Sequence, residues 1–383
     1  MRTGGHDSRH TGHEGVTSLV ILQPTPFCNI NCSYCYLPQR SDRTTLTIDQ
    51  LQRVFEKLVT FPTISKRTTV VWHAGEPLVL GAQYYDAAFA RIRECCPPDL
   101  QIDHAFQTNG MLVDDEWCDL FRRWKVGVGV SIDGPKHIND AYRKTRSGKG
   151  TFDKTVAGIQ RLKQNNIPFY VISVLTRAAL EDPDGLFALY HELGIRDVGF
   201  NIEEQEGIHT ATTVDSDLPP RSVQDFLRRF NELMREHDFH IVVREIEETM
   251  ASIRHFDKRG PVNNLVIPFG IITIDVRGDV YTFSPEIAGY SSKDFETFAI
   301  GNIFADSFAE IETSKVLKAM TAQIASGVEL CRTSCKYFSV CGGGAPSNKV
   351  FENGTFASTS TTHCELTKKR VTDYLLETIE AMA

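Results

Sequence analysis

Apolar and polar positions along residues 16–202 follow two periods in turn. Short β-rich apolar runs alternate with amphipathic stretches of helical period. The apolar runs read SLVILQPT, RTTVVWHA, DHAFQTN, VGVGVSID, FYVISVLT and DVGFNI. The amphipathic stretches cover residues 48–60, 84–95, 115–124, 154–165 and 185–193. Such β–α repeats predict a parallel sheet covered by helices. Six repeats are too few to close an eight-fold barrel, so we expect an α/β fold, a partial (β/α)6 TIM-like barrel with a wide mouth.

The pattern changes after residue 202. The next stretch is charged and helical in character, which predicts a connector or a substrate-facing insertion. Further on, IITIDVRGDVYTF predicts a hairpin with Arg277 and Gly278 at its turn, and VFENGTF predicts a second one because Asn-Gly suits a tight primed turn. An amphipathic helix follows. The expected domains are a disordered tail (1–15), the partial barrel (16–202), the helical insertion (203–260) and a C-terminal domain (261–383).

Composition narrows the class of protein. The chain has 383 residues and a formal charge of −8, whereas binding to nucleic acid requires a basic surface. It has no apolar run of about twenty residues, so we expect no membrane span. Residues 1–15 are polar and glycine-rich, unlike a secretory signal. We therefore expect a cytoplasmic protein with no nucleic-acid partner.

The ten cysteines fall into three groups. The first, the cysteine trio, is Cys28, Cys32 and Cys35. The second, the cysteine quartet, is Cys331, Cys335, Cys341 and Cys364. Cys95, Cys96 and Cys118 lack ligand spacing and are expected to be small buried apolar residues. Since a reducing cytosol disfavours disulfides, the trio and the quartet indicate metal binding or catalysis.

The trio directly follows the first predicted strand, in the segment PFCNINCSYCY. It is therefore expected at the carboxyl end of the sheet, where barrel active sites are built. Three thiolates on one short loop can hold three irons of a cubane [4Fe–4S] cluster and leave the fourth iron open. An open coordination position is typical of a reactive metal site. A zinc knuckle with a ligand from elsewhere, or a coincidence, is the alternative.

The motif C-x3-C-x2-C, with Tyr34 before its last cysteine, resembles the signature of the radical S-adenosylmethionine (SAM) family. WHAGEP after the second strand resembles the family's GGEP element, with Ala74 at its first glycine. QTNG and SIDG follow the third and fourth strands, and Arg143 with GKGTF completes the resemblance over residues 20–175. The likeness implies these cofactor-binding residues: Tyr34, Gly75, Glu76, Pro77, Asn109, Ser131 and Arg143. Ser131 and Arg143 are candidate contacts of the SAM carboxylate, with a loop-structuring role as the alternative.

The quartet spacing suits either a closed zinc site or a fully ligated Fe–S cluster. Beside a radical SAM core it resembles the SPASM extension, which implies a SPASM-like Fe–S domain. Complete SPASM domains hold two auxiliary clusters. Here the hairpin has no cysteine, and Ala345 stands near another ligand position. The resemblance thus implies two [4Fe–4S] clusters in all, one binding SAM and one auxiliary, the latter serving in electron transfer or structure.

Several runs, among them CNINCSYCYLP, WHAGEPLVL and YFSVCGGGAPSNKVFENGTF, resemble cyclophane-forming peptide maturases of the glycine-rich (GrrM-like) type. That likeness implies a radical SAM enzyme that cleaves SAM reductively to a 5′-deoxyadenosyl radical. The radical takes a β-hydrogen from a ribosomally made precursor peptide, and a carbon–carbon crosslink to an aromatic ring forms. The implied partners are that peptide and an electron donor such as flavodoxin or ferredoxin. Glu286 is a candidate proton acceptor, with a plain surface carboxylate as the alternative.

Three alternatives remain open on the sequence. A sulfatase-type maturase would oxidise Cys or Ser to formylglycine, but such enzymes resemble complete SPASM proteins with both auxiliary clusters. A thioether-forming peptide maturase is the second. A non-catalytic scaffold with structural zinc at both cysteine groups is the third, and the SAM-pocket motifs argue against it.

Overall fold

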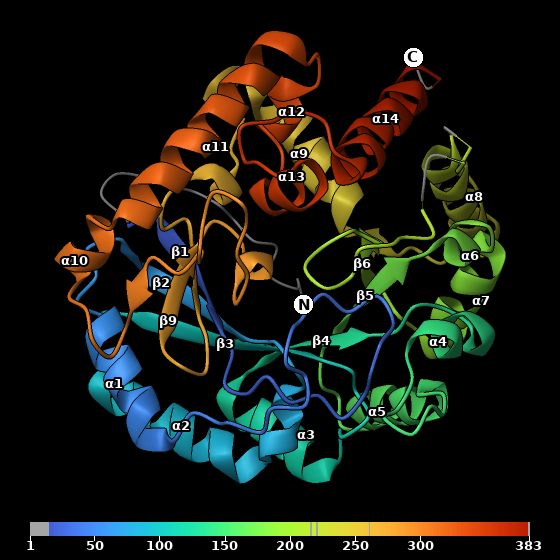
Figure 1. The fold of residues 1–383 in the computed structure, drawn as a ribbon. Coiled ribbons are helices and arrows are strands. Elements are labelled where there is room, and N and C mark those ends of the chain that lie inside the picture. Colours follow the sequence, from blue (N-terminus) through green and yellow to red (C-terminus); the bar gives the residue numbers. More distant parts are fainter. Residues whose placement is uncertain (1–14, 215–216, 220, 260, 382–383) are drawn as a thin grey trace.

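The computed structural model describes residues 15–214, 217–219, 221–259 and 261–381. The predicted tail lies outside the described residues except for Gly15. In the described part, ten strands form one sheet in the order β10-β9-β8-β1-β2-β3-β4-β5-β6-β7. The strands curve around one side of the molecule, with the helices of the first half outside them (Figure 1).

Six parallel strands in sequence order form the centre of the sheet. They are β1 (Thr17–Leu22), β2 (Ile64–Trp72), β3 (Gln101–Thr108), β4 (Gly127–Ser131), β5 (Tyr170–Leu175) and β6 (Asp197–Ile202). The covering helices are α1 (Ile48–Leu58), α2 (Ala82–Cys95), α3 (Asp115–Trp124), α4 (Lys136–Tyr142), α5 (Phe152–Gln164), α6 (Arg177–Leu180) and α7 (Pro183–Leu193). The prediction of a partial six-stranded α/β barrel is confirmed.

Local sequence explains where these helices begin. Thr47 caps α1 in a reciprocal capping box with Gln50, and Asp114 caps α3 by accepting from the backbone N–H of Trp117. Aromatic side chains then join helix to strand. The rings of Tyr85 on α2 and Phe106 on β3 meet edge to face, with centroids 4.7 Å apart. This packing joins α2 to β3 near the carboxyl end of the strand, where the site is built.

The rest of the chain continues the sheet and adds helices, most of which lie across from α1, α2 and α3 (Figure 1). The helices are α8 (Ser222–Glu236), α9 (Arg244–Arg259), α10 (Phe308–Glu312), α11 (Lys315–Ser334), α12 (Phe338–Cys341), α13 (Pro346–Asn353) and α14 (Arg370–Glu380). The strands are β7 (Val242–Val243), β8 (Ile271–Ile274), β9 (Asp279–Thr282) and β10 (Gly301–Asn302). Four short helical turns are η1 (Pro77–Leu80), η2 (Asn264–Val266), η3 (Pro285–Ile287) and η4 (Cys364–Lys369), the last with π geometry.

One of the two predicted hairpins is confirmed. Strands β8 and β9 pair antiparallel, and Gly278 adopts the positive φ (+84°) that their turn requires. The hairpin predicted at VFENGTF is wrong, because residues 346–353 form α13. Asn-Gly suits a turn, but glycine also ends helices in the left-handed conformation, and Gly354 does so with φ of +74°.

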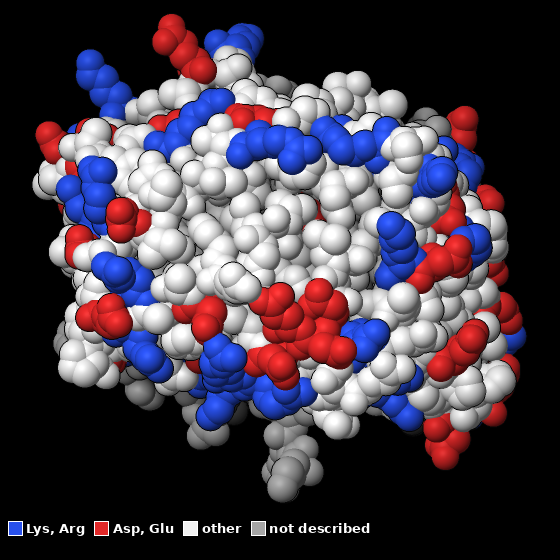
Figure 2. Space-filling model, turned by 90° about the horizontal axis from the view of Figure 1, so that it is seen from below, with Lys and Arg blue, Asp and Glu red and all other residues white. Residues whose placement is uncertain are grey.

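One face of the molecule combines charged and uncharged areas. Figure 2 shows a face on which Lys and Arg side chains are interspersed with Asp and Glu around a broad uncharged area. Among the helices that the structure describes, none has the length and apolar character of a bilayer span.

Candidate functional site

A cavity of about 240 Å³ opens at the carboxyl ends of strands β2 to β6. All three trio cysteines line it. Six of the other predicted residues line it too: Tyr34, Gly75, Glu76, Asn109, Ser131 and Arg143. Pro77 does not line it but begins η1, where it is buried directly behind Glu76. The structure thus gathers residues that are spread over more than a hundred positions of the sequence.

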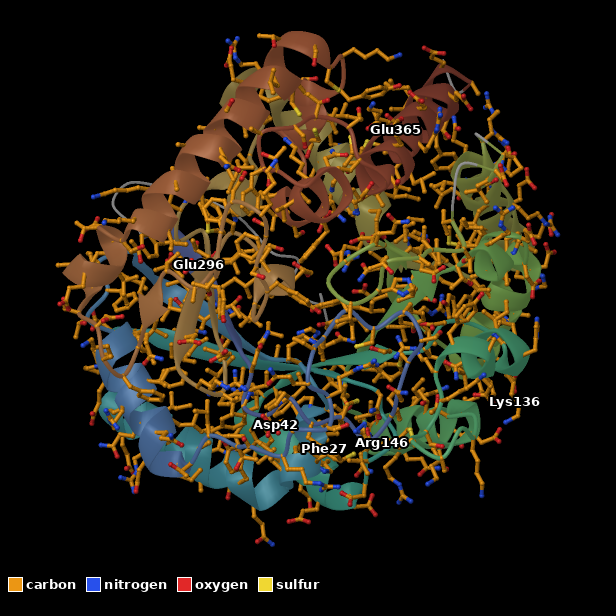
Figure 3. The ribbon with its side chains drawn as sticks, viewed as in Figure 1. Phe27, Asp42, Lys136, Arg146, Glu296 and Glu365 are labelled. Carbon is orange, nitrogen blue, oxygen red and sulfur yellow. The ribbon has the colours of Figure 1, made fainter. Side chains whose placement is uncertain are left out.

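The trio loop is fastened from two directions. The backbone N–H of Asn31 donates to the carbonyl of Lys144 (2.7 Å), and the guanidinium of Arg40 donates to the carbonyl of Cys32 (2.9 Å). At the start of the loop, Phe27 lies beneath Arg146, whose guanidinium is 5.2 Å from the ring centroid; Figure 3 labels both. These contacts fasten the loop to Arg40 and to residues 144–146.

Burial raises the pKa of the Cys28 thiol to about 12, and that of Cys32 likewise to about 12. Thiols become good ligands only when deprotonated, so a cationic metal centre has to displace these protons as it binds. No three His, Cys, Asp or Glu side chains of the described residues converge as a ready-made metal site.

A buried carboxylate organises the floor of the cavity beside Cys32. Asp133, fully buried at the end of β4, accepts from the Tyr34 hydroxyl (2.5 Å) and from the backbone N–H of Val174 (3.0 Å). It also forms an ion pair with Arg143, whose Nε lies 3.0 Å from its Oδ2. Tyr34 and Arg143 are thus held by one anchor, and both still line the cavity. Arg143 combines the structuring role weighed from the sequence with exposure to the cavity.

A second buried carboxylate joins the ends of β2 and β3. Glu76 accepts from the backbone N–H of Asn109 (2.7 Å), from the Thr108 hydroxyl (2.7 Å) and from the backbone N–H of Leu78 (3.0 Å). Burial raises the pKa of Glu76 to about 7, against the lowering effect of these hydrogen bonds. Glu76 therefore ties the end of β2 to the residues that follow β3 at the cavity wall.

The turn before Glu76 explains the glycines of its motif. A Cβ on Gly75 would lie 2.4 Å from the carbonyl oxygen of Phe27, and φ is +58° there. Ala74, which stands where the motif has glycine, also has positive φ (+72°), and its side chain is buried. An alanine in this conformation costs about 1–2 kcal/mol. The turn nevertheless keeps positive φ at both Ala74 and Gly75.

The wall across from the trio loop is acidic, and of its residues the sequence analysis singled out only Glu286. Glu203, Glu204 and Glu206 directly follow β6, and Glu286 lies on η3; all four line the cavity. Glu286 is thus no plain surface carboxylate. Desolvation and neighbouring carboxylates raise the pKa of Glu206 well above its usual range. The sequence signal that could have revealed this wall is that three glutamates directly follow a strand, because residues after barrel strands commonly line the active site.

The quartet forms a separate site in the C-terminal part of the molecule. All four cysteines line a cavity of about 210 Å³. Figure 3 labels Glu365, next to Cys364, well away from Phe27 beside the trio. The buried Lys349 extends its Nζ to 3.5 Å from the Sγ of Cys331 and 3.2 Å from the carbonyl of Gly327. Lys349 therefore offers a hydrogen-bond donor to one sulfur of the quartet.

Comparisons with known proteins agree with this geometry. The model of the radical SAM superfamily matches residues 22–189. An uncharacterised Synechocystis protein, sll1766, is 38% identical over 96% of this chain and 93% of its own length. The serine-type anaerobic sulfatase-maturating enzyme of Bacteroides thetaiotaomicron is 25% identical over 86% of this chain and 83% of its own.

Solved structures share the fold. Native anSMEcpe with bound AdoMet matches with a TM-score of 0.78 at 19% identity, covering 95% of this chain and 98% of that one. SuiB of Streptococcus suis, bound to its precursor peptide SuiA, matches with a TM-score of 0.64 at 14% identity, covering 91% and 76%. With the superfamily motifs matched and gathered at one cavity, the chain belongs to the radical SAM superfamily and is an enzyme of the radical SAM type.

Proposed function

We propose that this enzyme is a peptide maturase that forms a carbon–carbon crosslink, a three-residue cyclophane, in a ribosomally made precursor peptide. One observation carries the proposal: a single cavity joins the trio, the SAM-motif residues and a wall of four carboxylates. The carboxylates can accept hydrogen bonds from the amides and cationic groups of a peptide. A flavodoxin or ferredoxin would donate the electron.

The residues present fit the cofactors of this chemistry. Cys28, Cys32 and Cys35 would hold a [4Fe–4S] cluster with one open iron, as three thiols on one loop at the cavity allow. Around it, Gly75, Asn109, Ser131 and Arg143 would bind SAM, with Tyr34, Glu76 and Pro77 shaping the pocket. When bound, this pair of cofactors supplies a 5′-deoxyadenosyl radical that takes hydrogen from an unactivated carbon.

The quartet would hold a second [4Fe–4S] cluster in full ligation, which suits the uptake of an electron rather than the binding of substrate. The ammonium of Lys349 beside Cys331 fits the negative charge of such a centre. Crosslinking to an aromatic ring also releases a proton when aromaticity is restored. Glu286 and the neighbouring carboxylates of the cavity wall are placed to accept it.

A sulfatase-type maturase is the second candidate, favoured by the sulfatase-maturating relatives. Against it, the chain has no cysteine between residues 118 and 331, so the β8–β9 hairpin offers no ligand for a further cluster. The two candidates differ in product. A cyclophane carries no aldehyde, whereas formylglycine reacts with a hydrazide probe.

The test begins with cofactors. Anaerobic reconstitution should give about eight irons per chain, whereas zinc or about twelve irons would refute the two-cluster assignment. SAM and a strong reductant should then yield 5′-deoxyadenosine. Cys32→Ala should abolish that product, while Cys118→Ala, which alters a buried cysteine outside both cavities, should retain it.

The second step uses peptides. The wild-type enzyme is incubated with the glycine-rich, aromatic precursor encoded beside its gene, if one is present, and separately with Cys- and Ser-containing sulfatase peptides. Loss of two hydrogens from the precursor, with a crosslink located by fragmentation and no reaction with hydrazide, supports the cyclophane. A hydrazide-reactive sulfatase peptide instead establishes the formylglycine activity.

A further inference from the structure

The acidic wall of the catalytic cavity is supported by residues that belong to the far end of the chain. Glu204 lines the cavity, and one of its oxygens lies 2.5 Å from Nδ1 of His363. Its other oxygen accepts from the side-chain amide of Asn348 on α13 (3.0 Å). The same amide reaches Glu206 at 3.4 Å. Neither His363 nor Asn348 lines the cavity itself, so both act on it through the glutamates.

His363 also borders the quartet site. It is joined by one peptide bond to Cys364, which lines the quartet cavity. Its carbonyl accepts from the hydroxyl of Thr367 within η4 (2.7 Å), and its backbone N–H approaches Glu352 at 3.5 Å. The backbone of His363 is therefore tied to the segment that carries Cys364. A continuous link runs from the catalytic cavity through Glu204 and His363 to the quartet.

The link connects the catalytic cavity with the quartet cavity. Cys364 lines one cavity together with the other three quartet cysteines, so a metal centre held by these four thiols would constrain it. The imidazole of His363 is held mostly out of water, with 19% of its side chain exposed, and the Glu204 side chain is 20% exposed. Because both side chains are largely enclosed by protein, a displacement of His363 is expected to move Glu204 as well.

We propose that His363 is a positioning residue that conveys the state of the quartet to Glu204 in the catalytic cavity. The inference rests on the proposed function, since it takes the quartet as a metal-cluster site and the cavity as the substrate site. Loading the quartet fixes Cys364 and the His363 backbone, and the imidazole then fixes Glu204. The acidic wall of the cavity takes its final arrangement only when the quartet holds its metal cluster. Thermodynamic coupling of this kind is reciprocal and usually amounts to roughly five- to a hundredfold in an equilibrium constant.

Hydrogen–deuterium exchange at residues 203–206 measures this coupling without turnover. The backbone N–H groups of Glu203 and Glu206 donate to Leu175 (3.1 Å) and His209 (3.0 Å), so their exchange reports how firmly the wall is held. The reconstituted full-length enzyme is compared with Cys335→Ser, which removes a quartet ligand without touching His363. Cys341→Ser replaces it if that variant does not fold. Each change is also made in a His363→Gln background.

A matched control is available on the same wall. His209 pairs with Glu203 at 3.3 Å, but it is not adjacent in sequence to any quartet cysteine. We expect Cys335→Ser to speed exchange at 203–206 several-fold in the wild type and in His209→Gln. In the His363→Gln background, Cys335→Ser should have no further effect on exchange at 203–206. His363→Gln alone should keep the iron content of the wild type. Equal effects in the His363→Gln and wild-type backgrounds, or no effect in the wild type, would overturn the proposal.

Iron content separates this result from a failure of the proposed function. If the wild-type protein takes up only one cluster, the two-cluster model fails. The exchange comparison is then repeated with Zn²⁺, which four thiolates also bind. Protection of residues 203–206 by Zn²⁺ in the wild type but not in His363→Gln still supports the coupling. Equal protection in both refutes it.

Discussion

Replacing Asp133 by Asn tests how the floor of the cavity beside the trio is held. The substitution keeps the shape of the side chain and an oxygen for the N–H of Val174. It removes the negative charge that faces Arg143, and it alters the partner of the Tyr34 hydroxyl. Both affected side chains line the cavity, so the change acts on stability and on the site together.

The magnitude follows from burial and distance. Asp133 has 0% and Arg143 8% of its side chain exposed, and the charged atoms are 3.0 Å apart. At an effective dielectric of about 20, Coulomb's law gives roughly 5 kcal/mol at that separation. Removing one partner of a buried pair costs about 3–5 kcal/mol, because the other charge is left buried alone. Since a domain is stable by only about 5–15 kcal/mol, the expected loss is a large fraction of the total.

Urea unfolding of the anaerobically purified protein, followed by circular dichroism, measures the loss. Asp115→Asn is the matched control: Asp115 lies 2.9 Å from Arg161, but 67% and 44% of the two side chains are exposed. That pair should contribute at most about 1 kcal/mol. Adding Arg143→Gln to Asp133→Asn should recover part of the loss, since no unpaired charge remains. If Asp133→Asn costs no more than Asp115→Asn, burial does not govern this pair and the reasoning is wrong.

Three further predictions concern the turn and the two sites. Ala74→Gly should raise the free energy of unfolding by about 1 kcal/mol, because it relieves a positive φ; a drop in the urea midpoint would contradict this. Glu76 is expected to reduce stability as pH rises from about 4.5 to about 7, since its pKa is raised in the folded protein. Glu76→Gln should flatten that part of the stability–pH curve, and an unchanged slope would contradict it. Lys349→Met should lower iron retention at the quartet and shift the midpoint potential of its cluster to more negative values in an EPR redox titration, because it removes a positive charge beside Cys331.

The barrel and the place of the trio could be predicted from the sequence because each depends on local order. Apolar strands recur before each motif, and parallel strands bring their carboxyl ends to one edge. That logic brings Cys28, Gly75, Asn109 and Ser131 to one cavity. Their roles as ligands and SAM contacts stay predictions.

Long-range pairing could not be predicted in the same way. Nothing near Glu204 in the sequence indicates His363, because they are 159 positions apart and meet only after α13 and η4 are placed. The Asn353–Gly354 signal was ambiguous for a physical reason, since a positive φ at glycine ends a helix as readily as it makes a hairpin turn. Pro77 was predicted beside SAM, yet it starts a buried turn behind the wall.

Pairing of β1 with a strand from late in the chain has a consequence for synthesis. β1 lies between β2 and β8, and the Thr17 hydroxyl donates to the carbonyl of Phe269, 252 positions away (2.6 Å). A nascent chain therefore leaves the ribosome with one edge of β1 open until β8 has emerged, and contacts of such long range form slowly. An open strand edge is also a template for pairing with other chains. A truncation that ends before β8 is accordingly expected to aggregate unless a chaperone shields that edge.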